Sequence, residues 1–412
     1  MRFGWLIVLA VVFPFIVSAQ GGIISGKVLR KDKSPVAGAS VFLSNSSFGT
    51  ATAADGSFSL RGVRPGQYTL VVTLIGLEDY TKSILVGAQP IQLDIEMASR
   101  SIMLHDVQIS TRKDWLKNFE SFKKQFIGMD DNAKSCVIIN PEILSFNYYS
   151  TQKRLEAYAE DFLIVENRAL GYRVKFLIRD FKFDAIAGIV SYSGQRLFEE
   201  LPGSNKQKQK WAHARDFSYY GSEMHFLRSL YKDRLTEEGF EVHRYFRLPN
   251  ELRPPEDVIE RNIDRFKKAG RIDSANKWIG YANMSRYAHE MYYPEQLFVS
   301  QILSRTDQQG IFALVFPDNL CVQYVKKRDN TRDRTIYLPL NVPNYETTIL
   351  SFMTKDRVAF FDMNGVIITG SPLNEGTWAK SRLSQLLPVD YVPTDNVDVT
   401  LKEMLGANPQ GY

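Results

Sequence analysis

The sequence predicts an all-β sandwich followed by a larger α+β domain. Three observations support this order. Residues 22–98 alternate short apolar segments with turn residues, residues 115–126 carry aromatic side chains at helical spacing, and residues from 137 onward mix strand and helix patterns. A run of strands followed by a region of mixed strands and helices is typical of two domains that follow one another along the chain.

Residues 1–19 are predicted to be a secretory signal peptide. Arg2 precedes an apolar run from Gly4 to Val17, and Val17 and Ala19 supply small residues before the cleavage point. The run is shorter than the roughly 20 residues that a membrane-spanning helix needs, which disfavours an uncleaved anchor. No cysteine stands at the cleavage point and no later stretch is apolar enough to cross a bilayer. We therefore expect a mature chain that is soluble or peripherally bound to a membrane.

The charge balance does not indicate a nucleic-acid-binding protein. The chain has 51 Lys and Arg against 46 Asp and Glu, a net charge of +5. The basic clusters at 206–210 and 326–334 are interrupted by polar or acidic residues and lack interleaved aromatics on which bases could stack. Solvated loops or helix faces are the preferred interpretation of both clusters.

The two cysteines, Cys136 and Cys321, leave two alternatives open. An exported chain can form a single disulfide, but a chain of this length can bury its core without one, so two buried free thiols fit equally well. Two cysteines alone cannot form a structural zinc site.

Within the front region, strands are predicted at 23–30, 39–44, 49–53, 57–62 and 67–76. Phe58 and Leu60 fall on one face of their strand, as in a half-buried sheet. Asp55-Gly56 supplies the positive φ angles of a tight hairpin turn, and Pro65-Gly66 makes a second turn. Two sheets packed face to face follow from this pattern.

The segments "ISGKV", "PVAGASV", "TATAADGSFSL" and "GQYTLVVTLIGL" together resemble the carboxypeptidase regulatory-like domain, a transthyretin-like (prealbumin-like) β-sandwich. The resemblance places this domain at 20–98 and implies a scaffold or interaction surface. Ala53 and Ala54 replace the acidic or amide residues that are common in the family, which weighs against a cation site there. Residues 101–111, within a connecting strand or linker at 99–114, resemble a short strand that follows this module in envelope proteins.

The α+β domain is predicted to span 115–412, with a candidate subdivision near 250–257 at the Pro-rich "LRPPED". Asp114 is expected to cap a helix that ends at Gly128, and a core position for its aromatic stripe is preferred over partner docking. That stripe consists of Trp115, Phe119, Phe122 and Phe126. A meander of strands is expected over 137–200, helix over 205–238, and further strands at 240–248, 310–317, 320–327, 335–340 and 358–368.

Residues 215–230 and 374–393 resemble pieces of a C-terminal region that recurs with this front module in envelope proteins of Gram-negative bacteria. The resemblance implies architecture and a location in the periplasm or at the outer membrane, and it transfers no catalytic residue. The region is too short and too helical for a transporter barrel.

The sequence predicts no catalytic residue, no cofactor and no metal ligand. Metallocarboxypeptidases hold zinc with a His-x-x-Glu pair, and no histidine here has Glu three residues later. The chain also lacks a Gly-x-Ser-x-Gly elbow, a phosphate-binding loop and a dinucleotide fingerprint. The histidines are His105, His213, His225, His243 and His289.

Two local clusters deserve a structural test. Ser222 and His225 lie three residues apart near Arg215 and Tyr219, but a structural polar network is preferred over a nucleophile and its base because no oxyanion donor is identifiable. The aromatics of residues 277–293 could line a sugar-binding groove, and a core position is the preferred alternative.

The leading functional hypothesis is a non-enzymatic exported envelope protein that binds a protein partner or a polymer near the outer membrane. The partners considered are an outer-membrane protein or a polysaccharide, with peripheral membrane association left open and nucleic acid excluded. Two alternatives remain: a glycan- or peptide-processing hydrolase with a dispersed active site, and an accessory subunit of an outer-membrane importer.

Overall fold

The computed structural model of the chain describes residues 21–100, 111–329, 336–353 and 355–394. The predicted signal peptide at 1–19 and residues 101–110 of the predicted connecting strand lie outside this range. No helix in the described part of the chain combines the length and the apolar character that a membrane span requires.

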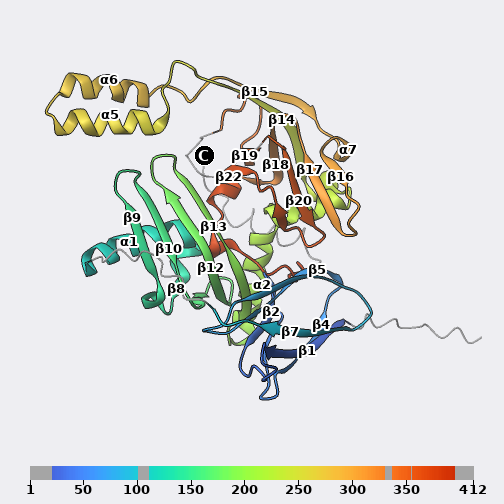
Figure 1. Ribbon diagram of the computed structural model, residues 1–412. Helices are drawn as coiled ribbons and strands as arrows, with labels where there is room; N and C mark the ends of the chain where they lie inside the picture. Colours follow the sequence, from blue (N-terminus) through green and yellow to red (C-terminus); the bar gives the residue numbers. More distant parts are fainter. Residues whose placement is uncertain (1–20, 101–110, 330–335, 354, 395–412) are drawn as a thin grey trace, which may run out of the picture.

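The front region is a β-sandwich, as predicted (Figure 1). One sheet has the strand order β4-β1-β7 and the other β3-β2-β5-β6. Ile24, Val28, Leu60, Leu70 and Val72 are fully or almost fully buried between the sheets. The strands are β1 (Gly22–Arg30), β2 (Ser40–Leu43), β3 (Gly49–Ala51), β4 (Ser57–Val63), β5 (Gly66–Thr73), β6 (Tyr80–Val86) and β7 (Ile91–Met97).

The Asp55-Gly56 turn does not close a hairpin, which corrects the sequence prediction. The turn itself is present, because Asp55 Oδ1 accepts a hydrogen bond from Ser57 N at 3.0 Å and Gly56 has φ +78°. However, β3 pairs with β2 and β4 pairs with β1, so the turn carries the chain from one sheet to the other. Of the two turn residues, only Gly56 has a positive φ.

A second, larger sheet follows, with the order β8-β11-β12-β10-β9 and with β13 paired to β12. Helix α1 (Arg112–Ile127) packs on it through Phe122 and Phe126, both fully buried, which confirms the core position of the aromatic stripe. Thr111, not Asp114, caps this helix, and Gly128 ends it as predicted. The strands are β8 (Cys136–Ile138), β9 (Ser145–Tyr149), β10 (Arg154–Tyr158), β11 (Leu163–Asn167), β12 (Tyr172–Asp184) and β13 (Ile189–Glu200).

The rest of the chain forms helices and two further sheets, with the orders β15-β14-β18-β19-β22 and β16-β17-β20-β21. The helices include α2 (Asn205–Tyr219), α3 (Glu223–Tyr231), α4 (Leu235–Glu238), α7 (Val299–Ile302) and α8 (Thr377–Lys380). The strands are β14 (Phe240–Pro249), β15 (Tyr287–Gln296), β16 (Leu303–Arg305), β17 (Ile311–Val315), β18 (Asn319–Arg328), β19 (Tyr345–Ser351), β20 (Val358–Asp362), β21 (Ile367–Thr369) and β22 (Leu373–Gly376). An α+β region thus follows the sandwich, and the predicted fold class is confirmed.

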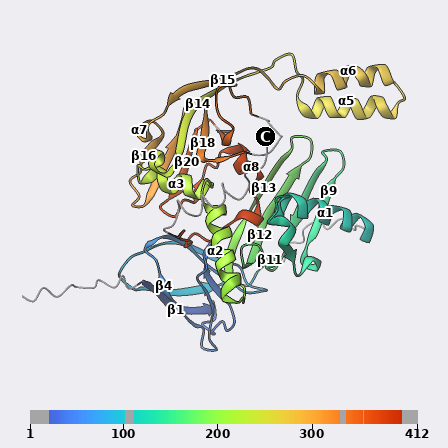
Figure 2. The same cartoon turned by 180° about the vertical axis from the view of Figure 1, so that it is seen from behind.

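One local prediction in this region is wrong. The strand expected at 335–340 is absent from its described residues, 336–340. The Pro-rich segment at 252–257 leads into α5 (Glu256–Lys268), which forms a helical hairpin with α6 (Ile272–Ala282) between β14 and β15. The hairpin extends away from the sheets in both ribbon views (Figures 1 and 2).

The sandwich is joined to the larger domain by main-chain hydrogen bonds. Asn45 N donates to Arg196 O at 2.7 Å, and Phe198 N donates to Ser46 O at 2.9 Å, so the end of β2 continues onto β13. Beside these bonds, Leu197 covers Phe42 and Val71 on the outer face of the β2-β5 sheet. That sheet is therefore buried on both faces at this point, which explains the apolar residues at positions that would otherwise face solvent.

Residues 388–391, the C-terminal strap, form the second joint. Val389 is 5% exposed within the sandwich core, its N–H donates to Asn45 O at 2.7 Å, and Asp390 accepts a hydrogen bond from Ser47 N at 2.8 Å. From α3, the guanidinium of Arg228 donates to Val389 O at 2.6 Å and Tyr391 O at 3.0 Å. One side chain of the larger domain thus holds the strap in the sandwich.

Replacing Arg228 should destabilise the whole protein. The same guanidinium also donates to Asn364 O at 2.9 Å, so Arg228→Ala leaves three carbonyls without their charged donor. We expect a loss of about 2–4 kcal/mol of unfolding free energy in urea titrations. Arg234→Ala is the matched control, since Arg234 makes only exposed ion pairs, and it should cost less than about 1 kcal/mol. Equal losses in the two variants would contradict the role given to Arg228.

Candidate ligand-binding site

Ser222 and His225 form a structural network, as the sequence analysis prefers. Ser222 caps α3, with its Oγ accepting a hydrogen bond from His225 N at 3.2 Å. The His225 ring is 2% exposed, accepts from Gly221 N at 3.1 Å and lies 3.2 Å from Glu238 Oε2. Burial lowers the pKa of His225, and the Ser222 hydroxyl binds the backbone N–H of His225 rather than its ring.

Both cysteines are free and buried, so the free-thiol alternative holds. Cys136 lies on β8 in the main core, and Cys321 lies on β18 beside Tyr245 and Ile349. Burial in apolar surroundings raises the pKa of Cys136 to about 12 and raises that of Cys321 as well. Neither thiol is activated for chemistry.

This arrangement predicts the outcome of a thiol titration. Native protein purified without reductant should react with neither thiol on the time scale of minutes, because both are buried and protonated. In denaturant without reductant, two thiols per chain should react with Ellman's reagent. A chain that shows free thiols only after reduction would contradict the structure.

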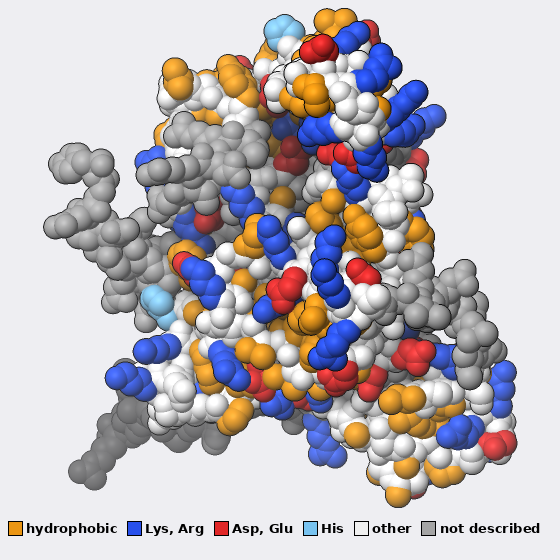
Figure 3. Space-filling model, turned by 90° about the vertical axis from the view of Figure 1, so that its left-hand side faces the viewer, with side chains coloured by type: hydrophobic (Ala, Val, Ile, Leu, Met, Phe, Trp, Pro, Cys, Tyr) orange, Lys and Arg blue, Asp and Glu red, His pale blue; other side chains and the backbone are white. Residues whose placement is uncertain are grey.

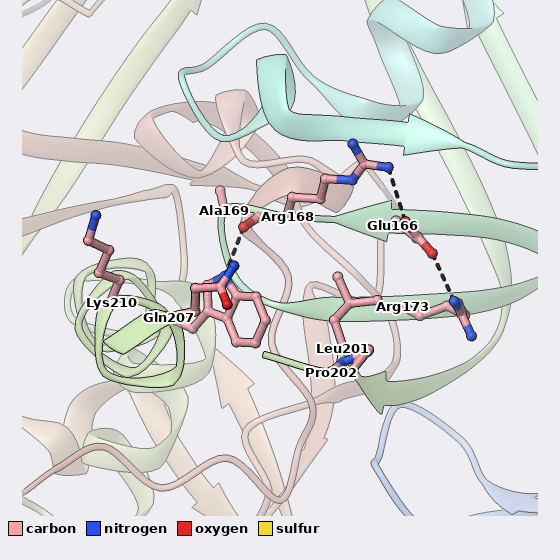
Figure 4. Close-up of a pocket in the computed structure, with 9 residues that line it drawn as sticks. Glu166, Arg168, Ala169, Arg173, Leu201, Pro202, Gln207 and Lys210 are labelled. Carbon is pink, nitrogen blue, oxygen red and sulfur yellow. Dashed lines mark hydrogen bonds and ion pairs between the residues drawn. The ribbon is translucent and has the colours of Figure 1, made fainter. Parts of the chain in front are cut away.

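A hollow on the surface lies between α2 and the turn that joins β11 to β12 (Figure 4). Its volume is about 500 Å³, which is within the range of small-molecule sites. Its wall combines cations, one carboxylate, an amide, an indole and aliphatic groups. These residues are Glu166, Arg168, Ala169, Arg173, Leu201, Pro202, Gln207, Lys210 and Trp211.

The turn under the pocket is held by side chains from its own start and from α2. Asn167 Oδ1 accepts from Leu170 N at 3.1 Å, and its amide donates to Ser384 O at 2.8 Å. From α2, Trp211 Nε1 donates to Arg168 O at 2.9 Å and Arg215 Nε donates to Leu170 O at 2.7 Å. Because Trp211 and Arg215 are four residues apart, they reach the turn from one face of the helix.

Arg215 is therefore a supporting residue of this turn rather than a partner of Ser222. Its guanidinium also donates to Gly171 O at 3.2 Å and to Glu200 Oε1 at 2.7 Å, and it lies 3.8 Å from the centre of the Tyr172 ring. Arg215 is 9% exposed, and its buried charge is compensated by these acceptors and by the face of the Tyr172 ring.

Two glycines allow the indole to lie against the backbone. Gly171 has φ +69°, and a Cβ built there would be 2.1 Å from Trp211 Cδ2. A Cβ at Gly203 would be 2.6 Å from Cη2 of the same ring. Larger residues at either position would displace the indole, so the wall of the pocket depends on both glycines.

The pocket carries an excess of positive charge. Glu166 pairs with Arg173 at 2.8 Å and with Arg168 at 3.4 Å, and the hydrogen bond from Arg173 lowers the pKa of Glu166. Each guanidinium uses only one of its five donors on Glu166, and Lys210 adds a third cation at the rim. The site can therefore accept an anionic or hydroxyl-rich ligand.

The same charges disfavour acid–base catalysis in this pocket. A glycosidase needs two facing carboxyl groups, one of them with a raised pKa, so that it can donate a proton. Glu166 is the one carboxylate in the lining, and its pKa is lowered. A smaller hollow of about 130 Å³ beside α1 and β10 has no carboxylate in its lining.

The prediction of solvated faces is confirmed for one basic cluster and is wrong for Lys327 of the other. Residues 206–210 lie on an exposed face of α2, as predicted, and Gln207 and Lys210 of this face also line the pocket. In the cluster at 326–334, Lys327 is 8% exposed and donates to the carbonyls of Phe217, at 2.6 Å, and Tyr220. Sequence alone did not distinguish Lys327 from an exposed lysine, because its surroundings come from distant segments.

The aromatic side chains of residues 277–293 do not lie in the main core, so the core position predicted for them is wrong. Trp278 and Tyr281 lie on α6 and are half-buried, and Tyr287, Tyr292 and Tyr293 on β15 are half-buried too. None of them lines either described pocket. The pocket beside α2 leaves no local pattern in the sequence, because its residues come from a turn, a strand end and a helix that are separated in the chain.

Residues 24–109 match the CarboxypepD_reg-like domain family. The N-terminal domain is thus a carboxypeptidase regulatory-like domain, as the sequence resemblance implied. Comparison with curated proteins gives no match.

Solved structures with some similarity include three whose TM-scores are all below 0.2. A putative membrane-associated protein of unknown function from Bacteroides fragilis is 8% identical, with 86% of this chain and 93% of that chain covered and a TM-score of 0.17. A DUF3823 family protein from Bacteroides ovatus is 14% identical, with 44% and 82% covered and a TM-score of 0.16. A type II cohesin–X-dockerin complex from Acetivibrio cellulolyticus is 19% identical, with 24% of this chain and 72% of that chain covered and a TM-score of 0.19.

Gly171→Ala should damage the pocket, and Gly188→Ala provides a matched control. Both glycines have φ near +70°, but a Cβ at Gly188 meets nothing within 4 Å. Each variant pays about 1–2 kcal/mol for the left-handed backbone, and Gly171→Ala should cost about 1–3 kcal/mol more because the new methyl overlaps Trp211. Urea titration gives the energies, and a shift in tryptophan emission should accompany Gly171→Ala alone. Equal energies and spectra would contradict the described contact.

Proposed function

We propose that this protein is a non-enzymatic, exported cell-envelope protein whose pocket beside α2 binds an anionic polysaccharide. The observation that carries the proposal is the combination of Trp211 with Arg168, Arg173 and Lys210 around one hollow. Sugar rings pack on aromatic side chains through their C–H faces, and guanidinium groups bind carboxylates with paired hydrogen bonds. A uronic acid unit offers both groups.

The shape of the pocket favours a polymer over a small free ligand. The hollow is open at the surface, as expected where a chain must enter and leave, and its cations lie on three separate segments of the chain. Arg168 is 62% exposed in its side chain and Arg173 is 41% exposed, so both can reach neighbouring units of one chain. The turn that carries Arg168 is fixed by Asn167, Trp211 and Arg215, which lowers the entropy cost of binding.

The export part of this proposal rests on residues 1–19 and on the sequence resemblance to envelope proteins. The sandwich supports the scaffold role, because it is fixed to the larger domain at two joints and keeps α2 at a constant position relative to it. The binding alternative is preferred over the hydrolase because the pocket lining pairs its single carboxylate with two arginines.

The test is calorimetric titration of the full mature chain with tetragalacturonate and, in parallel, with the neutral maltotetraose. We expect binding of the acidic sugar only, and Lys210→Gln should weaken it about tenfold through the loss of one charge-assisted contact. Lys208→Gln, on the same helix but outside the pocket lining, should leave the affinity unchanged. Equal binding of both sugars, equal effects of both variants or no binding of any acidic oligosaccharide would overturn the proposal.

A further inference from the structure

The helical hairpin of α5 and α6 has little core of its own. Of its residues, Ile259 and Ala275 are the buried ones, and the two helices contact each other over their length. The hairpin extends from the rest of the molecule (Figures 1 and 2) and buries so few of its side chains that core packing does not explain its presence. An interaction surface is the alternative explanation.

Charge is segregated along this hairpin. The carboxylates of α5 are all paired. Glu256 pairs with Arg253 of the stem at 2.8 Å and Glu260 with Lys153 of the sheet at 2.5 Å, whereas Asp257 pairs at 2.6 Å with Arg261 on the exposed surface of α5 itself. Asp264 also lies 3.3 Å from Lys153, which stands between β9 and β10. The negative charge of α5 is thus neutralised by paired cations, and three of its four carboxylates pair with residues outside the helix.

The other end of the hairpin is positive. Residues 265–272, the hairpin tip, contain four cations and no carboxylate, and Asp273 follows at the start of α6. No ion pair involving these cations occurs among the residues that the structure describes. In Figure 3, where the hairpin faces the viewer, Lys and Arg side chains lie in the upper part of the molecule, with Asp and Glu side chains among them. The cations are Arg265, Lys267, Lys268 and Arg271.

Apolar groups lie among these cations. Ile272 is 59% exposed. The guanidinium groups of Arg265 and Arg271 lie over the Phe266 ring, 5.7 Å and 5.4 Å from its centre. Gly270, with φ +68°, closes the turn without a side chain. A soluble polyanion would pair with the cations but would leave Ile272 in water. A lipid surface meets both groups, because its headgroups carry charge and its acyl region takes apolar side chains.

We propose that the hairpin tip docks the protein on a membrane surface that contains anionic phospholipids. Lys267, Lys268 and the two arginines contact the headgroups, and Ile272 enters the boundary with the acyl chains. The tip and the pocket beside α2 share no residue, so this site acts independently of polysaccharide binding. Docking through the tip holds the sheets and the pocket away from the bilayer.

The test is sedimentation of the full mature chain with vesicles of phosphatidylcholine, alone or with 30% phosphatidylglycerol. The chain should sediment only with the anionic vesicles, and binding should fall steeply with added salt. Lys267→Gln/Lys268→Gln should lower the partition coefficient about 25-fold, since each basic residue near the surface contributes a factor of about five. Ile272→Ser should lower it several-fold. The control pair Lys206→Gln/Lys208→Gln on α2 should change it less than twofold.

Each variant should keep its fold, because all the substituted side chains are exposed. Circular dichroism checks that the helix content of each variant is unchanged. Several results would overturn the proposal: equal binding to neutral vesicles, equal loss in the tip and control variants, or no effect of Ile272→Ser. Binding of soluble polygalacturonate that depends on Lys267 and Lys268, without vesicle binding, would replace the membrane with a polymer as the occupant of the tip.

Discussion

The arrangement of this protein depends on the guanidinium of Arg228. It donates to carbonyls of residues 364, 389 and 391, which belong to a β-turn of the larger domain and to the C-terminal strap. The strap in turn places Val389 in the sandwich core, while Asn364 donates its amide to Gln67 O of the sandwich at 2.6 Å. Arg228 thus fixes the turn at Asn364 and the strap, and both of these segments contact the sandwich. The sandwich and the larger domain are therefore held as one body rather than as separate units joined by a flexible linker.

The same segments that secure the sandwich also support the pocket. Residues 215–230 and 374–393, which resemble parts of a recurrent envelope-protein region, lie against each other: Trp378 Nε1 donates to Gly221 O at 2.7 Å, and Tyr391 donates to Asp216. Ser384, from the second segment, accepts from Asn167 at the base of the pocket turn. The two segments therefore form one joint between the sandwich and the larger domain. The pocket and the hairpin tip are then carried on a rigid scaffold.

Much of the fold could be predicted from local pattern, and the errors have physical causes. Strands β9 to β13 and the aromatic stripe of α1 were predictable because alternation and helical spacing report burial directly. Strand β7, "IQLDIEM", alternates strictly and was missed although its signal was present. The pocket was not predictable in this way, since it forms where Arg168, Lys210 and Trp211 meet through tertiary contacts. Likewise, nothing local distinguishes the buried Lys327 from an exposed lysine.

The central claim, that sandwich and larger domain form one body, can be tested directly by hydrogen exchange of three amides at the joint. Asn45 N, Phe198 N and Val389 N donate to Arg196 O, Ser46 O and Asn45 O across the two parts. The account predicts that these amides exchange as slowly as the core strands β5 and β12, because they open only when the whole protein unfolds. Exchange of all three within seconds, while β5 and β12 stay protected, would show that the sandwich detaches freely and would contradict the account.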